Sequence, residues 1–271
     1  MAPKEMYGNS SIEPDYEKIA KHYGMEYKGG GERISVLKNL EEITEDCSNK
    51  LILSGVTFID ISAAKKNKIS PLTDLAILCA IHTNDDKILV GVRGRRYGKE
   101  LTSERVRDMA NNCYALVPAG GLTFRFDENP LDYTLKNEAM EELGIFPNEI
   151  SNKKIISIFK ANKIGPLGYK IVEIFKTPLN SKEIIERHKE SLNEYFSLCK
   201  NLPEKEACKK LKTENKPNDA WEHSEIIPLN MNVSALEKFI EEIPKNENNY
   251  LQHRLCGIGI GGLLSVVDYL R

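Results

Sequence analysis

The chain has 271 residues, 41% of them hydrophobic, which is enough for one large domain or for one domain with a smaller companion. Its 38 basic and 40 acidic residues give a formal net charge of −2, so the charge balance supports neither a nucleic-acid nor a membrane surface as partner. The N-terminus has no apolar run typical of a secretory signal, and the six cysteines lack CxxC spacing. We therefore expect free thiols in the cytoplasm rather than zinc sites.

The first part of the chain, residues 1–70, is expected to be an N-terminal extension or a small subdomain. Residues 16–31 predict a short helix that ends at a glycine turn, and residues 49–62 predict one or two strands. The pattern becomes clearer from Leu75, where residues 75–94 predict a β-hairpin with a polar turn at positions 84–86. Residues 114–124, YALVPAGGLTF, predict a third strand that runs into a pair of glycines.

The second half of the chain alternates between helical and β-type patterns. We expect helices at about 131–143, 180–200, 233–243 and 249–271, and strands at 154–162, 168–178 and 220–229. The lysine- and glutamate-rich residues 200–219 are expected to be a solvated, mobile insertion rather than a basic binding patch. The apolar run near the C-terminus, CGIGIGGLLSVV, is too short to span a bilayer. Strands interleaved with helices predict an α/β fold, an α+β sandwich.

The stretch NEAMEELGI places three carboxylates on one helix face. Glu138 lies i,i+3 from Glu141 and i,i+4 from Glu142, so the three charges repel one another unless a cation is near. The opposite face carries an apolar stripe that can pack on a core, formed by Leu135, Ala139 and Leu143. The acidic face is either a solvated surface or a site for a hard divalent cation such as Mg²⁺, which prefers oxygen ligands.

Residues 117–145, VPAGGLTFRFDENPLDYTLKNEAMEELGI, resemble the Nudix box, whose pattern is Gx5Ex7REUxEExGU with U aliphatic. The second half of the pattern coincides with Glu138, Ala139, Glu141, Glu142, Gly144 and Ile145. The resemblance extends from about Leu75 to the C-terminus and implies a Nudix-type mixed sheet between helices over residues 71–271. Two departures stand out: Asn137 replaces the box arginine, and the upstream loop is two residues longer, so its acid is either Asp127 or Glu128.

Nudix enzymes hydrolyse a nucleoside diphosphate linked to another moiety, and the resemblance therefore implies a metal-dependent pyrophosphohydrolase. Its catalytic carboxylates would be Glu138, Glu142 and Glu141, which would also bind Mg²⁺ or Mn²⁺. A backbone carbonyl of Gly120 or Gly121 would add to the metal ligands. The family often adds a carboxylate from a later strand or loop, and the candidates for it are Glu222 and Glu225.

The substrate would be a small nucleotide whose phosphates bind guanidinium groups, with Arg93, Arg95, Arg96 and Arg125 as candidates. Tyr97, Tyr114 and Phe124 are candidates for stacking on a base, although Tyr114 equally fits a core. His223 is either a base or a packed residue.

Distant similarity to the UDP-glucose-hydrolysing branch favours a nucleoside diphosphate sugar, while ADP-ribose and dinucleoside polyphosphates stay open. Oligomeric state, including a homodimer, also stays open. The alternative is a Nudix-fold module that binds a nucleotide or a protein without catalysis, as Asn137 and the longer loop suggest.

Overall fold

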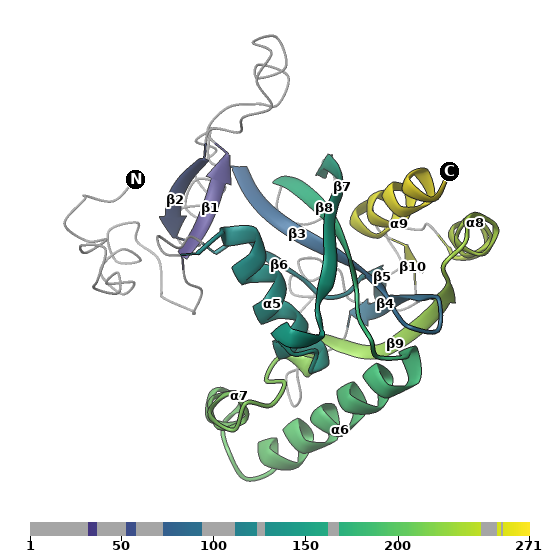
Figure 1. Ribbon diagram of the computed structural model, residues 1–271. Coiled ribbons are helices and arrows are strands. Elements are labelled where there is room, and N and C mark those ends of the chain that lie inside the picture. The colour runs from purple at the N-terminus through teal and green to yellow at the C-terminus, as the bar shows by residue number, and fades with distance from the viewer. Residues whose placement is uncertain are drawn as a thin grey trace. The chain divides into compact units, whose positions relative to one another are not determined.

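The computed structural model describes residues 32–36, 53–57, 73–93, 112–123, 128–161, 168–244, 254–255 and 257–271. Over these ranges the chain forms two β-sheets and five α-helices (Figure 1). This mixed arrangement confirms the predicted α+β sandwich class. The chain divides into two compact units, of which the first comprises Met1–Ala76, Gly121–Thr134 and Leu167–Tyr169, and the second comprises Ile77–Gly120, Leu135–Pro166 and Lys170–Arg271.

The first unit contains a small antiparallel ladder. Strand β1 (Glu32–Val36) pairs with β2 (Leu53–Thr57), and its end also pairs with the first residues of β3 (Thr73–His82). Strand β2 lies within the range 49–62 that the sequence predicts to be extended. The helix predicted over residues 16–31 lies outside the described residues.

The second unit contains strands of both sheets. In one sheet the order is β3, β8 (Gly168–Lys176) and β7 (Ser151–Ala161), and β6 (Ala119–Gly121) also pairs with β3. In the other sheet the order is β10 (Arg254–Leu255), β5 (Cys113–Leu116), β4 (Lys87–Arg93) and β9 (His223–Asn230). The pairing of β4 with β9 is antiparallel and runs from Lys87 opposite Asn230 to Arg93 opposite His223.

The predicted hairpin at residues 75–94 differs from the structure in one respect. Strands β3 and β4 and the polar turn between them occur as predicted, but the two strands belong to different sheets. From Leu75 to His82 in β3 and throughout β4, almost every residue is buried, on both faces. A strand that is buried on both faces must have other elements packed on each side. The chain passes from one sheet to the other at the turn, so that both strands can be packed in this way.

The main core lies among the two sheets, α8 (Val233–Glu242) and α9 (Gly257–Leu270). Both helices appear at the right of Figure 1, and α9 packs on β5 and β7. The glycines of α9 allow this close packing, because a Cβ on Gly259 would lie 2.0 Å from the carbonyl oxygen of Tyr114. The apolar C-terminal run is therefore a core helix, and no described helix has the length and apolarity needed to cross a membrane.

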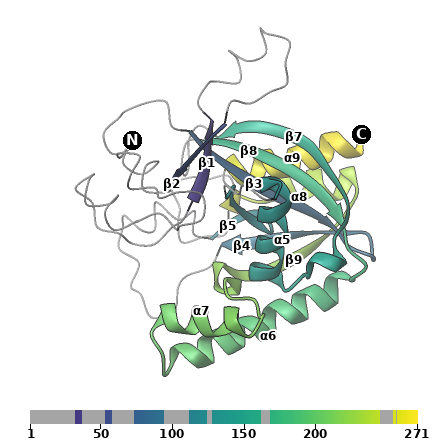
Figure 2. The same cartoon turned by 60° about the vertical axis from the view of Figure 1, so that its left-hand side comes forward.

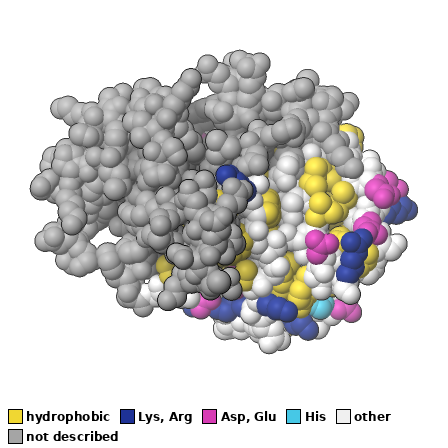
Figure 3. Space-filling model, turned by 90° about the horizontal axis from the view of Figure 1, so that it is seen from above, with side chains coloured by type: hydrophobic (Ala, Val, Ile, Leu, Met, Phe, Trp, Pro, Cys, Tyr) yellow, Lys and Arg dark blue, Asp and Glu magenta, His cyan; other side chains and the backbone are white. Residues whose placement is uncertain are grey.

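The surface of the second unit mixes charged and apolar side chains. Figure 3 shows Lys and Arg close to Asp and Glu on the described part of the face seen from above, with hydrophobic side chains among them. Large exposed apolar side chains occur on β7 and α9, and Lys154 lies 4.9 Å from the ring centre of one of them, Tyr269.

Helix α6 (Ser181–Cys199) begins at a capping box, in which Asn180 accepts a hydrogen bond from the Glu183 amide and the Glu183 carboxylate accepts one from the Asn180 amide. Asp85, in the turn between β3 and β4, accepts two further hydrogen bonds from Ser181, one from the amide at 2.7 Å and one from the hydroxyl at 2.6 Å. The start of α6 is thus joined to the β3–β4 turn.

The expectation that residues 200–219 form a mobile insertion is wrong for half of that segment. Residues Glu204–Thr213 form helix α7, which lies beside α6 in Figures 1 and 2. The physical reason is a short apolar stripe: Ala207 and Leu211, at i,i+4, are fully buried. Leu211 packs with Tyr195 of α6 and with Trp221 in a second, smaller core.

Candidate active site

The acidic helix, α5 (Pro130–Leu143), matches the predicted range of about 131–143. At the start of α5, Asn129 accepts a hydrogen bond from the Leu131 amide at 2.9 Å. The apolar stripe of the helix has no exposed surface, as the spacing predicts; it consists of Leu135, Ala139 and Leu143. The helix ends at Gly144, whose φ of +69° is a left-handed conformation that favours glycine.

Two of the three helix carboxylates converge on strand β6. A Cβ on Gly120 would lie 1.9 Å from Oε1 of Glu138, so the Glu138 carboxyl occupies the space that any side chain at position 120 would need. Glu142 Oε1 accepts a long hydrogen bond from the Ala119 amide at 3.4 Å. The i,i+4 spacing of Glu138 and Glu142 therefore directs both side chains to the glycine-containing strand.

Glu142 is also bonded to a histidine from β9. Its Oε2 lies 2.9 Å from Nε2 of His223, and the side chains are 1% and 2% exposed, respectively. The imidazole ring lies over Gly91, where a Cβ would approach Nδ1 to 2.4 Å. Gly91 in β4 thus accommodates the histidine, as Gly120 accommodates Glu138.

The protonation of this pair follows from its burial. Burial and the negative charge of Glu222 raise the pKa of the Glu142 carboxyl well above its usual range. Burial and the nearby Arg93 charge lower the pKa of His223 to about 3. Both directions favour a neutral carboxylic acid hydrogen-bonded to a neutral imidazole. A bound cation would reverse this preference for Glu142, because it would favour the carboxylate.

Arg93 and Glu222, two predicted site residues, form an ion pair. The Nη1–Oε2 distance is 2.5 Å, and the side chains are 32% and 22% exposed. Although burial lowers the pKa of the Arg93 guanidinium, the charges of Glu222, Glu142 and Glu138 raise it, and the net direction is upward. The structure therefore brings Arg93 and Glu222 beside Glu142, and Glu222 binds the arginine.

Glu141, the third box carboxylate, is oriented to a different partner. Its Oε1 accepts a hydrogen bond from Lys212 of α7 at 2.8 Å, and its backbone carbonyl accepts one from the Asp219 amide at 2.9 Å. Burial and the charges of Glu222 and Glu141 raise the pKa of the Asp219 carboxyl to about 6, against the hydrogen bond from Trp221. Asp219 is thus close to both Glu141 and Glu222.

Four functional-site neighbours were not predicted as such: Lys212, Asp219, Cys79 and Glu173. Burial raises the pKa of the Cys79 thiol, and the charges of Glu173, Glu142 and Glu138 raise it further, so this thiol stays protonated. Glu173 is 5% exposed on β8. The one signal for Glu173 in the sequence is a single carboxylate inside the apolar strand GYKIVEIFK, which argues for a role beyond packing.

The other predicted residues are distributed as follows. Tyr114 is a core residue, 6% exposed and packed edge-to-face on Phe239, so it is not available to stack on a nucleobase. Glu225 is exposed on β9, and Gly121 ends β6. Predicted residues that lie outside the described ranges are Arg95, Arg96, Tyr97, Phe124, Arg125 and Asp127. Within the described ranges, no group of three or more His, Cys, Asp or Glu side chains has a geometry that holds a metal ion.

The donor set nevertheless suits a hard cation. The carboxyl groups of Glu138 and Glu142 meet at β6, and the glycine there leaves Glu138 the space next to the backbone. Carboxylate oxygens without thiolate or free imidazole ligands are the donors preferred by Mg²⁺ and Mn²⁺. The residues therefore fit the metal that the box implies.

No protein-family model matches the chain, and no curated protein matches it in sequence. Among solved structures, the Deinococcus radiodurans protein DR0079 matches at 10% identity and a TM-score of 0.31, over 55% of this chain and 74% of that one. A MutT/nudix family protein from Enterococcus faecalis matches at 14% identity and a TM-score of 0.28, over 52% and 46% of the two chains.

A bifunctional NMN adenylyltransferase/ADP ribose pyrophosphatase from Francisella tularensis, complexed with AMP and a Mn ion, matches at 14% identity and a TM-score of 0.34. The match covers 66% of this chain and 40% of that one, so the chain spans less than half the length of this protein and of the Enterococcus protein. Likenesses at these values carry no inference about activity.

Proposed function

We propose that this protein is a metal-dependent hydrolase that cleaves the pyrophosphate linkage of a nucleoside diphosphate derivative, with a nucleoside diphosphate sugar as the preferred substrate. The observation that carries the proposal is the convergence of Glu138 and Glu142 on Gly120. Two carboxyl groups held together at a glycine strand repel each other when ionised, and a divalent cation turns that repulsion into binding.

The proposed roles of the carboxyl groups differ with their surroundings. Glu138 and Glu142 would hold Mg²⁺ or Mn²⁺, and the bound ion would supply a Lewis acid that polarises a phosphoryl oxygen and lowers the pKa of water. Further metal ligands proposed from the sequence are Glu141, Glu222 and the Gly121 carbonyl. His223 donates or accepts at Glu142 Oε2 and so sets the direction in which that carboxyl points.

Arg93 is the proposed phosphate ligand from the described part of the chain. Its guanidinium already pairs with Glu222, and a substrate phosphate would compete for the same N–H groups. Arg95, Arg96 and Arg125 remain proposals from the sequence. A small nucleotide substrate in the cytoplasm fits the free thiols of Cys79 and Cys113 and the balanced charge of the chain.

A second candidate function is a binding module without catalysis. It is favoured by one observation: two of the proposed metal carboxylates, Glu141 and Glu222, are already engaged by Lys212 and Arg93. A chain of this kind would bind a nucleotide through Arg93 but would leave the phosphate linkage intact.

The deciding experiment measures phosphate and nucleotide release from nucleoside diphosphate sugars, ADP-ribose, dinucleoside polyphosphates and nucleoside triphosphates, with Mg²⁺, with Mn²⁺ and with a chelator. We expect metal-dependent cleavage, strongest for nucleoside diphosphate sugars. Glu142→Gln should lower kcat at least about 100-fold because it removes a charged oxygen from the metal set.

Glu190→Gln is the matched control, because Glu190 is an exposed glutamate of α6 and lies outside the site. It should leave turnover unchanged. Circular dichroism must show both variants folded. Absence of cleavage of every compound by folded wild-type protein would reject the hydrolase, and nucleotide binding under the same conditions would then favour the binding module.

A further inference from the structure

Glu141, on the acidic face of α5, has no basic residue three or four positions away along the helix. Side chains that can reach Glu141 along α5 lie three or four positions away, and the two on its N-terminal side are Asn137 and Glu138. The two positions on its C-terminal side, Gly144 and Ile145, lie beyond the helix. A cation that pairs with Glu141 must therefore come from elsewhere in the fold.

Helix α7 provides that cation. Lys212 Nζ lies 2.8 Å from Glu141 Oε1, and the carboxylate is 17% exposed although the lysine side chain is 66% exposed. The lysine thus reaches in from solvent to a largely buried acid. The burial of Ala207 and Leu211 sets which side of α7 faces the protein, and Lys212 follows Leu211 directly.

Two further hydrogen bonds, from residues near α7 and on α6, hold the C-terminal end of α5. The Asp219 amide donates to the Glu141 carbonyl at 2.9 Å, and Arg187 of α6 donates to the Gly144 carbonyl at 2.8 Å. Arg187 is itself fixed by two bonds to the Glu149 carboxylate, at 2.8 and 2.9 Å. The end of α5 is thereby fastened to the α6–α7 segment at a side chain and at two carbonyls.

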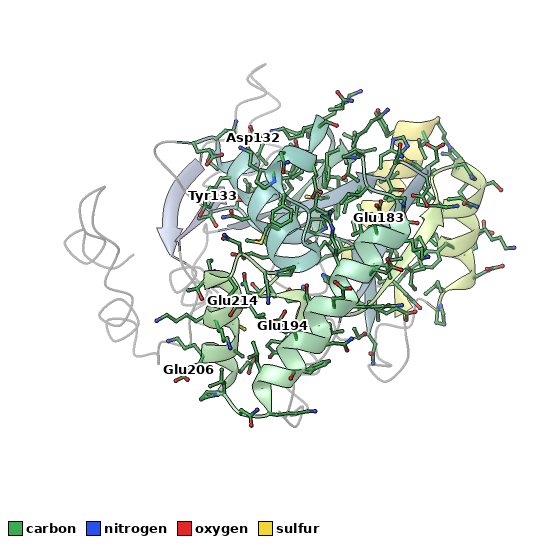
Figure 4. The ribbon with its side chains drawn as sticks, turned by 60° about the horizontal axis from the view of Figure 1, so that its bottom comes forward. Asp132, Tyr133, Glu183, Glu194, Glu206 and Glu214 are labelled. Atoms are coloured by element: carbon green, nitrogen blue, oxygen red, sulfur yellow. The ribbon has the colours of Figure 1, made fainter. Side chains whose placement is uncertain are left out.

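The α6–α7 pair is braced against relative movement. Lys216 Nζ binds Glu194 of α6 at 2.6 Å and Glu214, at the C-terminal end of α7, at 2.9 Å. Figure 4 labels both glutamates, on the two neighbouring helices. This bridge and the small core around Tyr195 fix the place from which Lys212 extends.

We propose that Lys212 is a positioning residue for the acidic helix: its ion pair with Glu141 supplies the charge that residue 137, as asparagine, does not supply, and it fixes where Glu138 and Glu142 lie against β6. The catalytic consequence rests on the proposed hydrolase function. The structural consequence, a helix end that is held or released, does not depend on that function.

The test compares Lys212→Met, which removes the charge and keeps an unbranched side chain, with Lys209→Met, the same change at an exposed lysine of the same helix. Hydrogen exchange, followed by mass spectrometry of peptides over residues 137–145, reports on the end of α5. Exchange should be faster in Lys212→Met and unchanged in Lys209→Met. In parallel, kcat should fall about 3- to 10-fold with KM little changed, since misplaced carboxylates affect the reacting centre.

A rescue variant separates charge from bulk. Asn137→Arg places a guanidinium at i,i+4 from Glu141, so Asn137→Arg combined with Lys212→Met should restore slow exchange and wild-type kcat. Equal exchange in Lys212→Met and Lys209→Met would overturn the positioning role. Faster exchange that the added arginine fails to slow would overturn its electrostatic basis.

The two proposals fail in different ways. If wild-type protein hydrolyses nothing, the hydrolase is rejected, and the exchange data still test the role of Lys212. If wild-type protein is active and Lys212→Met matches it in exchange and kcat, the positioning role is rejected and the hydrolase stands.

Discussion

Neighbouring residues of one helix, Glu141 and Glu142, make acid–base pairs of nearly equal length in unlike surroundings. The Glu142–His223 pair is 2.9 Å long and no more than 2% exposed, whereas the Glu141–Lys212 pair is 2.8 Å long with a lysine that is 66% exposed. Burial drives the first pair toward neutral partners, whereas solvent around Lys212 screens the second pair. Distance alone therefore says little about what each contact contributes.

The largest expected difference is in stability. His223→Ala should lower the free energy of unfolding by about 3 kcal/mol, because it leaves a buried Glu142 oxygen without its partner and opens a cavity. Lys212→Ala should cost less than about 1 kcal/mol, as exposed ion pairs do. Urea unfolding of the two variants without metal measures both values. Similar losses of unfolding free energy in the two variants would contradict the difference between the two pairs. An unchanged near-ultraviolet circular dichroism spectrum would show that neither variant is rearranged more widely.

The next effect concerns pH and Asp219, which is close to both Glu141 and Glu222. Its folded-state pKa of about 6 lies above the usual value of 3.8, so the folded protein holds this proton more tightly than the unfolded chain does. Its contribution to stability is therefore largest below about pH 4 and falls as the pH rises to about 6, by about 2 kcal/mol.

Asp219→Asn should remove this fall in stability with rising pH. In metal-free protein it should therefore raise the free energy of unfolding at pH 7. Unfolding free energies of wild type and variant at several pH values from 4 to 7 test the expectation. An unchanged slope in the variant would assign the pH dependence to other groups.

The smallest effect is a response to salt. Raising the ionic strength from about 0.1 to about 1 M shortens the Debye length from about 10 to about 3 Å, which weakens an exposed ion pair and leaves a buried neutral pair almost untouched. The stability difference between wild type and Lys212→Ala should therefore shrink by about 0.5 kcal/mol, while the difference between wild type and His223→Ala stays constant. Equal salt responses would contradict the distinction between the two pairs.

The sequence by itself determined the local features of the site. The i,i+4 stripe of Leu135 and Ala139 and the glycine after Leu143 predicted the acidic helix and its end, because local spacing and backbone preference set both. The sandwich class and the strands at 168–178 and 220–229 followed from alternating patterns in the same way.

Only the tertiary structure decided which partner each carboxylate meets. The pairs Glu142–His223, Arg93–Glu222 and Glu141–Lys212 join residues far apart in the chain, and no local pattern records such separations. Helix α7 was missed because its short stripe at Ala207 and Leu211 is diluted by charge and gains its stability from packing on α6. The place of β3 and β4 in different sheets was likewise decided by the need to bury both faces of each strand, a property of the whole fold.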